Sequence, residues 1–425
     1  MLRRFALGFI PFVLLAGCAT QAPAPISSPT EPVPVPLPEP PPPPPPPPVA
    51  PPPALSPTPA PPPPAKPGTI KPVVDRSTRE LVGRLLPDKI SDRNGWRDDI
   101  ATALVALKLP ASHENICAAI AVIEQESSFQ ADPVVPGLNR IVWKKIEGYA
   151  DRYGVPFPIV EAILKRKSAN GRSYAERINA LKTERQMNLL FEDIVDELPI
   201  GREQLIAHNP IRTGGPMQVS FAFAEQHMRH WPYPYSFKTS LRQEVFTRRG
   251  GVYFGIANLL HYPANYPEML YRFADFNAGQ YSSRNVAFQA ALASVAGKRH
   301  AKLTLDGDLL IYRDGAPTTE RSATLAALLA VADRLDLEES ALRRDLLQEK
   351  QLSFEQTATY RRLFALADQQ GGRKLPRAAL PQIRLQSPKI TRKLTTEWFA
   401  RRVDGRYQRC LGKATALVSP GGMGG

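Results

Sequence analysis

The pattern of apolar positions along the chain is mainly helical. In several segments, apolar residues recur three and four positions apart, and polar residues, glycine or proline bound each segment. This spacing places the apolar side chains on one face of a helix. We therefore predict helices over Asn115–Ser127, Tyr174–Leu198, Ser220–Arg229, Ser283–Ala296, Ala323–Leu335, Glu339–Gln351 and Phe354–Gln369.

One segment departs from this helical pattern. Lys302–Arg313 has apolar runs on either side of Asp306-Gly307, a dipeptide that favours the tight turn of a β-hairpin. The predicted fold class is therefore mostly α, with a short β-hairpin and a helical C-terminal extension.

The N-terminus has a short apolar run behind two arginines. The run Phe5–Leu15 is too short to span a bilayer, which needs about 20 apolar residues. These features predict a secretory signal peptide over residues 1–17. Leu15-Ala16-Gly17-Cys18 resembles the lipobox of bacterial lipoproteins, which implies cleavage before Cys18, acylation of its thiol and a membrane anchor. Ala19 follows, and by the same resemblance this favours the outer membrane, with the protein facing the periplasm. An ordinary secreted protein is the alternative.

A proline-rich segment follows the lipidated cysteine, over residues 18–67. Between Pro23 and Pro67 the chain holds 26 of its 46 prolines. Proline fixes φ and removes a backbone donor, so this segment favours extended polyproline II at about 3.1 Å per residue. We interpret it as a spacer, and a proline-rich ligand for a binding domain is the alternative. The rest is predicted to form a domain over 68–300 and a C-terminal region over 301–425, with the hairpin and basic helices.

Positive charge is concentrated near the C-terminus. The chain has a formal net charge of +14, and residues 371–413 alone hold twelve Lys or Arg against two acidic residues. Outside the cytoplasm we expect no nucleic acid partner, whereas anionic lipid headgroups or peptidoglycan carboxylates would suit this charge. Ser387-Pro388 is typical of a helix start, and Ile390, Leu394 and Trp398 follow at four-residue spacing. This predicts a basic amphipathic helix that either binds a membrane surface or packs on the domain.

Two cysteines, Cys117 and Cys410, remain besides the one to be lipidated. An oxidising periplasm permits a disulfide between them, and two buried thiols are the alternative. The six His residues show no metal-ligand spacing, and the chain has neither a phosphate-binding glycine loop nor a G-x-S-x-G elbow. The sequence therefore predicts no metal and no cofactor.

The first motif that indicates chemistry is Ile116–Phe129, which contains E-S-S-F. Residues Ile116–Ile123 are apolar all round, which predicts a buried helix. Glu126 lies near the helix end, where partial desolvation and the negative end of the helix dipole both favour the neutral acid. Protonation of a glycosidic oxygen requires such an acid. Glu126 is thus a candidate general acid, and a solvated surface glutamate is the alternative.

Two further motifs follow in the chain. Gly214–Val219 reads G-G-P-M-Q-V, in which glycines permit close backbone approach and Gln218 offers a sugar both a donor and an acceptor. Phe273–Tyr281 reads F-A-D-F-N-A-G-Q-Y and places Asn277 beside a glycine break between two predicted helices, where a plain helix cap is the alternative.

In this order, E-S-S-F, G-P-M-Q-V and F-N-A-G resemble the soluble lytic transglycosylase group of the lysozyme superfamily, whose members typically show E-S-x-F, G-L-M-Q and Y-N-A-G. The resemblance implies a lysozyme-like helical domain with a groove for the glycan strand of peptidoglycan. It implies that Glu126 is the single catalytic acid/base, cleaving between MurNAc and GlcNAc and leaving a 1,6-anhydro end. The residues it implies for substrate binding are Ser127, Met217, Gln218, Asn277 and Tyr281.

The chain departs from that family's pattern in three ways. Glu126 and Gln218 are 92 residues apart, which implies a large helical insertion at about 139–208, as a wall or lid over the groove. Pro216 stands where the family has Leu, and Phe276 where it has Tyr, a hydroxyl that Tyr281 would replace. The insertion also brings acidic residues that would serve a hydrolase as a second carboxylate, namely Glu161, Glu176, Glu184, Glu192 and Asp193.

Taken whole, the chain resembles a bacterial lipoprotein family of unknown function that has lysozyme-like motifs. Two functions of different class follow from the sequence. The first is a membrane-anchored peptidoglycan lytic transglycosylase, or a muramidase-type hydrolase if a second carboxylate takes part. The second is a peptidoglycan-binding or scaffolding lipoprotein that keeps the groove without turnover.

Overall fold

The computed structural model describes residues 72–168, 170–197, 209–297, 303–313, 315–385 and 394–418. The predicted signal peptide, Cys18 and the proline-rich segment lie outside these residues. The described chain is mostly α, as predicted, with two short two-stranded sheets. Within it, no helix is both long enough and apolar enough to cross a membrane.

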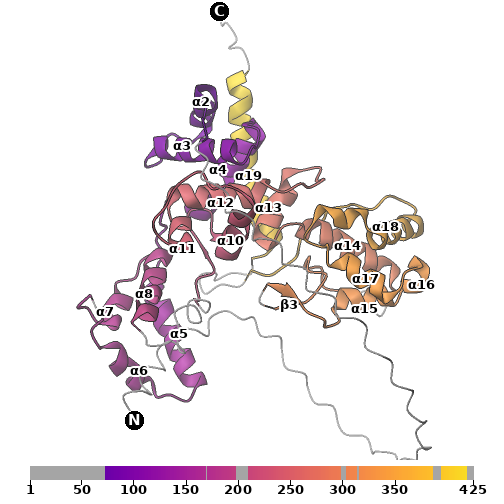
Figure 1. Cartoon of the computed structure of the whole chain (residues 1–425). Helices are drawn as coiled ribbons and strands as arrows, with labels where there is room; N and C mark the ends of the chain where they lie inside the picture. Colours follow the sequence, from indigo (N-terminus) through magenta and orange to yellow (C-terminus); the bar gives the residue numbers. More distant parts are fainter. Residues whose placement is uncertain are drawn as a thin grey trace, which may run out of the picture.

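The first hydrophobic cluster, which we call the first core, gathers helices from both ends of the described chain (Figure 1). Its central helix is buried on every side from Ile116 to Ile123, as predicted for a helix that is apolar all round. Its helices are α2 (Arg76–Leu85), α3 (Arg93–Ala106), α4 (His113–Ser127), α10 (Phe221–His230), α11 (Leu241–Val245), α12 (Arg248–Leu260), α13 (Met269–Ala278) and α19 (Thr396–Val418). Helix α19 packs against both α4 and α13, so the end of the chain completes this core.

The predicted insertion forms a hydrophobic cluster of its own. Its helices are α5 (Leu138–Arg152), α6 (Phe157–Leu164), α7 (Tyr174–Asn179) and α8 (Glu184–Asp196). The single helix predicted over Tyr174–Leu198 is wrong. Two helices form because each has a complete capping box, Ser173 with Glu176 and Thr183 with Gln186, which starts a new helix at Glu184.

A further cluster, the second core, lies beside the first in Figure 1. Its elements are α14 (Ser282–Val295), α15 (Ala323–Leu329), α16 (Ala332–Leu335), α17 (Glu339–Leu346), the 3₁₀ helix η1 (Leu352–Gln356) and α18 (Ala358–Gly371). The predicted domain boundary at residue 300 does not follow this packing, because α14 contributes to the second core and α19 to the first. The helices predicted over 323–335 and 339–351 are broken after Leu329 and end at Leu346.

Each sheet is a short hairpin. Strand β1 (Thr213–Gly214) pairs with β2 (Val219–Ser220), and β3 (Tyr312–Arg313) pairs with β4 (Ala316–Pro317). The hairpin predicted to turn at Asp306-Gly307 is therefore displaced toward the C-terminus. Gly307 instead packs on the start of α14, with φ at +86° and so close that a Cβ there would lie 2.8 Å from that of Ser282.

The C-terminal helix differs from its predicted form. Ser387, Pro388 and Ile390 lie outside the described residues, and Leu394 precedes α19, whose first residue is Thr396. The buried face consists of residues that were not in the predicted stripe, namely Phe399, Ala400, Val403, Tyr407, Cys410 and Ala414. Of the two interpretations, packing on the domain is confirmed, and Arg401, Arg402 and Arg409 lie on the exposed face.

Candidate active site

Glu126 lies in the last turn of α4, where the chain reverses sharply. Ser128 and Phe129 follow with φ of +49° and +59°, both in the left-handed region. Phe129 is buried, and its ring meets that of Trp96 edge-on at 5.4 Å, which fixes the end of the helix against α3. The carboxyl of Glu126 is thereby held, half-buried, at the edge of the first core.

The G-P-M-Q segment forms the turn between β1 and β2. Gly215 has φ of +74°, and a Cβ at this position would lie 2.1 Å from the carbonyl oxygen of Val245, so only glycine fits. Gln218 also has a positive φ, +50°. Its side-chain amide accepts from the Thr213 hydroxyl at 3.2 Å and donates to Glu184 at 3.2 Å, which holds the amide in place.

Asn277 lies at the end of α13, in the F-N-A-G motif. Its amide oxygen accepts a hydrogen bond of 2.9 Å from the Thr396 hydroxyl, at the start of α19. Gly279 ends the helix with φ of +110°, a backbone conformation that favours glycine. The orientation of Asn277 therefore depends on a residue more than a hundred positions further along the chain.

A buried carboxylate, Asp275, holds the turn that follows Asn277. It accepts from the backbone N–H groups of Tyr281 and Ser283 at 2.8 and 2.7 Å, and from the hydroxyls of Tyr262 and Tyr266 at 3.1 and 2.6 Å. Burial raises the pKa of this carboxyl, against the effect of its hydrogen bonds. Asp275 thus caps the N-terminus of α14 and joins the first core to the second.

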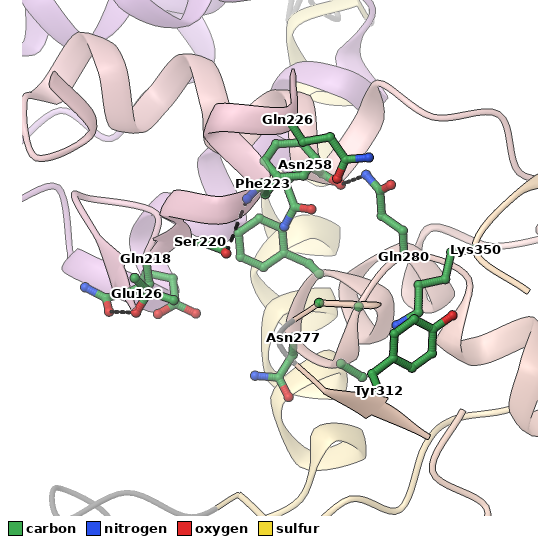
Figure 2. Close-up of a pocket in the computed structure, with 15 residues that line it drawn as sticks. Glu126, Gln218, Ser220, Phe223, Gln226, Asn258, Asn277, Gln280, Tyr312 and Lys350 are labelled. Carbon is green, nitrogen blue, oxygen red and sulfur yellow. Dashed lines mark hydrogen bonds between the residues drawn. The ribbon is translucent and has the colours of Figure 1, made fainter. Parts of the chain in front are cut away.

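The three motifs meet at one pocket of about 720 Å³. Figure 2 shows Glu126 beside Gln218 at one side of it, Asn277 in the middle, and Tyr312 with Lys350 at the other side. The described residues that line it are Glu126, Thr213, Gln218, Ser220, Phe223, Gln226, Asn258, Phe276, Asn277, Ala278, Gly279, Gln280, Tyr312, Gly315 and Lys350. Among these, Glu126 is the sole acid and Lys350 the sole base. A largely neutral, amide-rich lining of this kind suits a polar ligand such as a sugar.

Comparison with known proteins places this pocket within one family. The family model described as "Protein of unknown function (DUF1615)" matches residues 89–413, which span α4, α13, α14 and most of α19. The chain belongs to the DUF1615 family. It is similar to "Uncharacterized protein YaiW" of Escherichia coli (strain K12), with 47% identity over 333 residues that cover 78% of this chain and 88% of that protein. No solved structure matches the chain at a significant level.

The expectation of a family of unknown function is thereby confirmed for this DUF1615 protein. Neither match names a lytic transglycosylase or a lysozyme-like protein, so that resemblance stays a hypothesis. The match extends over both sides of the pocket, so the pocket as a whole is part of the family's sequence.

Three residues expected to contact substrate are not among those that line the pocket. Ser127 is buried and its hydroxyl donates to the Ile123 carbonyl at 3.0 Å. Met217 is fully buried, and a Cβ on Gly255 would lie 2.3 Å from its sulfur. The Tyr281 hydroxyl donates to the Pro263 carbonyl at 2.8 Å, so it does not replace the hydroxyl that Phe276 lacks. These residues have structural roles in this DUF1615 protein.

The described part of the insertion, residues 139–168 and 170–197, lies outside the lining of the pocket. None of its described residues lines the pocket, and its contact with the motifs is the hydrogen bond from Gln218 to Glu184. The other candidates for a second carboxylate are engaged inside the insertion or at its edge. Glu161 pairs with Lys165, Glu176 caps α7, Asp193 pairs with Arg177, and Glu192 accepts from Asn188 and Gln243.

The opposite wall comes from a region in which the sequence shows no motif. Tyr312 belongs to strand β3, and Lys350 lies between α17 and η1. Periodicity cannot find such residues, because they reach the pocket only through tertiary packing. Gln280 also lines the pocket, although its position in the third motif did not predict a role in binding. Its amide donates to the Asn258 carbonyl at 3.1 Å.

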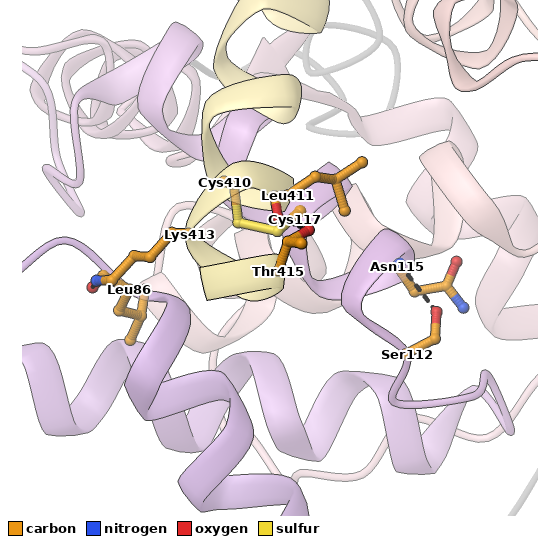
Figure 3. Close-up of a disulfide and its surroundings, with 8 residues drawn as sticks. All are labelled: Leu86, Ser112, Asn115, Cys117, Cys410, Leu411, Lys413 and Thr415. Atoms are coloured by element: carbon orange, nitrogen blue, oxygen red, sulfur yellow. Dashed lines mark hydrogen bonds between the residues drawn. A yellow bond between two sulfur atoms is a disulfide. The ribbon is translucent and has the colours of Figure 1, made fainter. Parts of the chain in front are cut away.

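The two cysteines form a disulfide that joins α4 to α19, with Cα atoms 5.5 Å apart (Figure 3). One of the two cysteines, Cys117, lies in the same helix as Glu126. Glu124 of α4 also pairs with two arginines of α19, Arg406 at 3.4 Å and Arg409 at 3.7 Å. In the described part of the chain, no group of three or more His, Cys, Asp or Glu side chains is arranged to hold a metal ion.

Proposed function

We propose that this DUF1615 protein is a peptidoglycan lytic transglycosylase that uses Glu126 as its single acid/base. The observation that carries the proposal is the meeting of Glu126, Gln218 and Asn277, from three separate motifs, at one pocket. These three residues are far apart in the sequence, and we would not expect unrelated helix ends to meet at one pocket. The resemblance of their motifs, in the same order, to those of lytic transglycosylases gives the pocket its chemistry.

The reaction would proceed in two proton transfers at one carboxyl group. Glu126, as the neutral acid, protonates the oxygen that links MurNAc to GlcNAc, and the bond from that oxygen to C1 of MurNAc breaks. The C6 hydroxyl of the same MurNAc then attacks C1, and the Glu126 carboxylate takes its proton. The products are a 1,6-anhydro end and a free GlcNAc hydroxyl, with no water consumed. The amides of Gln218 and Asn277 would hold the sugar during this sequence.

The acidic residues of the chain favour this route over hydrolysis. An inverting hydrolase needs a second carboxylate roughly 6.5–9.5 Å from the first, and a retaining one needs it at about 5–5.5 Å. Among the described residues that line the pocket, no second Asp or Glu accompanies Glu126. Glu184, one of the candidates for a second carboxylate, accepts a hydrogen bond from the lining residue Gln218.

We also propose that the protein is tethered to the outer membrane by lipid on Cys18 and faces the periplasm. The Cys117–Cys410 disulfide supports an oxidising compartment. The proline-rich segment would then act as a spacer between the lipid and the pocket, toward the periplasmic glycan.

The decisive experiment is digestion of purified peptidoglycan by the chain from residue 19 onward, with products read by mass spectrometry. We expect 1,6-anhydro ends that disappear with Glu126→Gln. Glu124→Gln is the matched control, because it lies on another face of α4 and does not line the pocket. Reducing ends that disappear with Glu184→Gln would instead identify a hydrolase.

A non-catalytic binder is the second candidate, and one observation favours it. Phe276 lines the pocket at the position where the resembling enzymes have a tyrosine, so a hydroxyl is missing there. If neither the chain nor Phe276→Tyr gives any product, but both sediment with peptidoglycan sacculi, the protein is a binder.

A further inference from the structure

The wall opposite Glu126 contains Lys350, the one basic side chain among the described residues that line the pocket. Lys350 lies across the pocket from Glu126 in Figure 2, and the described lining residues between them are uncharged. A ligand that fills the pocket would thus meet an acid at one end, neutral amides in the middle, and an ammonium group at the other. That order suits an uncharged sugar backbone with a negative substituent at one end.

The ammonium group of Lys350 is held in a defined place. It lies over the ring of Tyr312, 4.2 Å from the ring centre, and 3.3 Å from the carboxylate of Asp308. Both partners of the ion pair are about half exposed, 50% for Lys350 and 58% for Asp308. A pair this exposed contributes little free energy, about 0–1 kcal/mol. An incoming carboxylate can therefore exchange with Asp308 at small cost.

The backbone on both sides of Lys350 is anchored to α14. Arg284, which is almost fully buried, donates to the carbonyl of Glu349 and, at 2.8 Å, to that of Gln351. Asn285 donates to the Glu349 carbonyl at 3.1 Å. Since α14 begins directly after the F-N-A-G motif, the position of Lys350 is fixed relative to that of Asn277. A side chain supported in this way is preorganised for binding.

Tyr312 is anchored as well. Its side chain is partly buried and packs against the second core. The phenol ring is thereby a fixed part of the wall, and the face of an aromatic ring is a common platform for a sugar.

We infer that Lys350, supported by Tyr312, binds a carboxylate carried by the glycan and so selects a peptidoglycan strand over a neutral polysaccharide. This rests on the proposed function for the choice of a glycan, but not on turnover. Such strands offer two carboxylate sources: the lactyl group of MurNAc where no peptide is attached, and the stem peptide where one is attached through an amide bond. Both present the same chemistry to an ammonium group.

Binding is the test that separates this inference from catalysis. The Glu126→Gln chain, with and without Lys350→Met, would be titrated with three glycans of equal length. These are a neutral GlcNAc oligomer, a peptide-free alternating strand with free lactyl carboxylates, and a strand with stem peptides. We expect Lys350→Met to weaken the anionic strands about five- to tenfold and to leave the neutral oligomer unchanged.

Further variants sharpen the outcome. Lys350→Arg should retain the preference, and Asp308→Asn should strengthen anionic binding because it removes the competing carboxylate. Lys144→Met, an exposed lysine of α5, is the matched control and should change nothing. A loss confined to the peptide-bearing strand assigns the contact to the stem peptide, and a loss confined to the peptide-free strand assigns it to the lactyl carboxylate. A loss for both shows that Lys350 binds either carboxylate.

Equal weakening of neutral and anionic glycans, or no change at all, would overturn the inference. Absence of binding by the parent chain would overturn it too. Cleavage of the same strands is measured separately, with the chain that retains Glu126. If the anionic preference persists while no strand is cleaved, the enzyme proposal fails and the role of Lys350 stands.

Discussion

The two walls of the pocket differ in how they are built. The wall with Glu126 comes from three short motifs, each of which fixes its own backbone through a positive φ or a helix end. The wall with Lys350 has no motif, and anchoring to Arg284 and Asn285 holds it in place. The residues of the first wall can therefore be predicted from the sequence. The second wall forms only when the two cores pack together.

The difference suggests a division of roles. Under the proposed function, the motif wall would supply the acid and the amides for reaction at a glycosidic bond, and the second wall would supply the charge that selects an anionic glycan. If this division holds, variants of the first wall change the rate of cleavage and variants of the second change the choice of substrate.

The largest effect is expected at Glu126. Glu126→Gln keeps the size of the side chain but removes the transferable proton, so cleavage should fall by about 10²–10⁴-fold. Initial rates of anhydro-end formation would measure this, with binding of the strand to the variant as a check that the pocket is intact. A variant that retains more than a tenth of the rate would rule out Glu126 as the acid.

The disulfide gives the next largest effect, and it concerns the first core alone. Replacing Cys117 and Cys410 by serine removes a link between residues 293 positions apart, which should lower the free energy of unfolding by about 2–5 kcal/mol. Urea unfolding would measure the loss, and hydrogen exchange should show faster opening in α4 and α19 than in α15–α18. Equal acceleration in the second core would contradict this separation.

The second wall should show a pH dependence of its own. Burial raises the pKa of Glu349 from 4.5 to about 7, so the folded chain holds this proton more tightly than the unfolded one. The resulting stability is complete below pH 4.5 and is lost as pH rises through 7, a change of roughly 3 kcal/mol. Urea unfolding between pH 4.5 and 8 should therefore give a flatter profile for Glu349→Gln than for the parent chain. Glu320→Gln, at an exposed ion pair with Arg313, is the control and should keep the slope.

The smallest effect is expected at Thr396, which orients Asn277. Thr396→Val removes the 2.9 Å hydrogen bond and keeps the shape of the side chain, so cleavage should fall about three- to tenfold, near 1 kcal/mol. Thr396→Ser should restore most of the rate. If serine and valine behave alike, the hydroxyl does not position Asn277.

Elements whose pattern is complete within themselves can be predicted from the sequence. Helices α4, α10 and α14 begin and end within about two residues of the prediction, because continuous apolar periodicity and strong caps define them. Glu126, Gln218 and Asn277 were likewise found from motifs, and they do line one pocket.

The elements that differ from the sequence-based prediction depend on contacts between distant residues. The helix expected over 339–351 ends at Leu346, and beyond it the carbonyls of Glu349 and Gln351 accept from Arg284. The turn at Gly307 packs on Ser282 rather than pairing two strands. The place of Tyr281 in the motif predicts a contact with the ligand, but its hydroxyl donates to the Pro263 carbonyl.

The place of α19 in the first core also sets an order of events during synthesis. Phe399, Val403 and Tyr407 belong to the same core as α4, yet they are among the last of its residues to be made. Until α19 has been made, the surface of the first core that it will cover stays open, and the helix of Glu126 lacks its partner. The Cys117 thiol can form its disulfide only after Cys410 has been made. The first core, and with it the support of Glu126 and Asn277, is thus complete only after the last helix has been made.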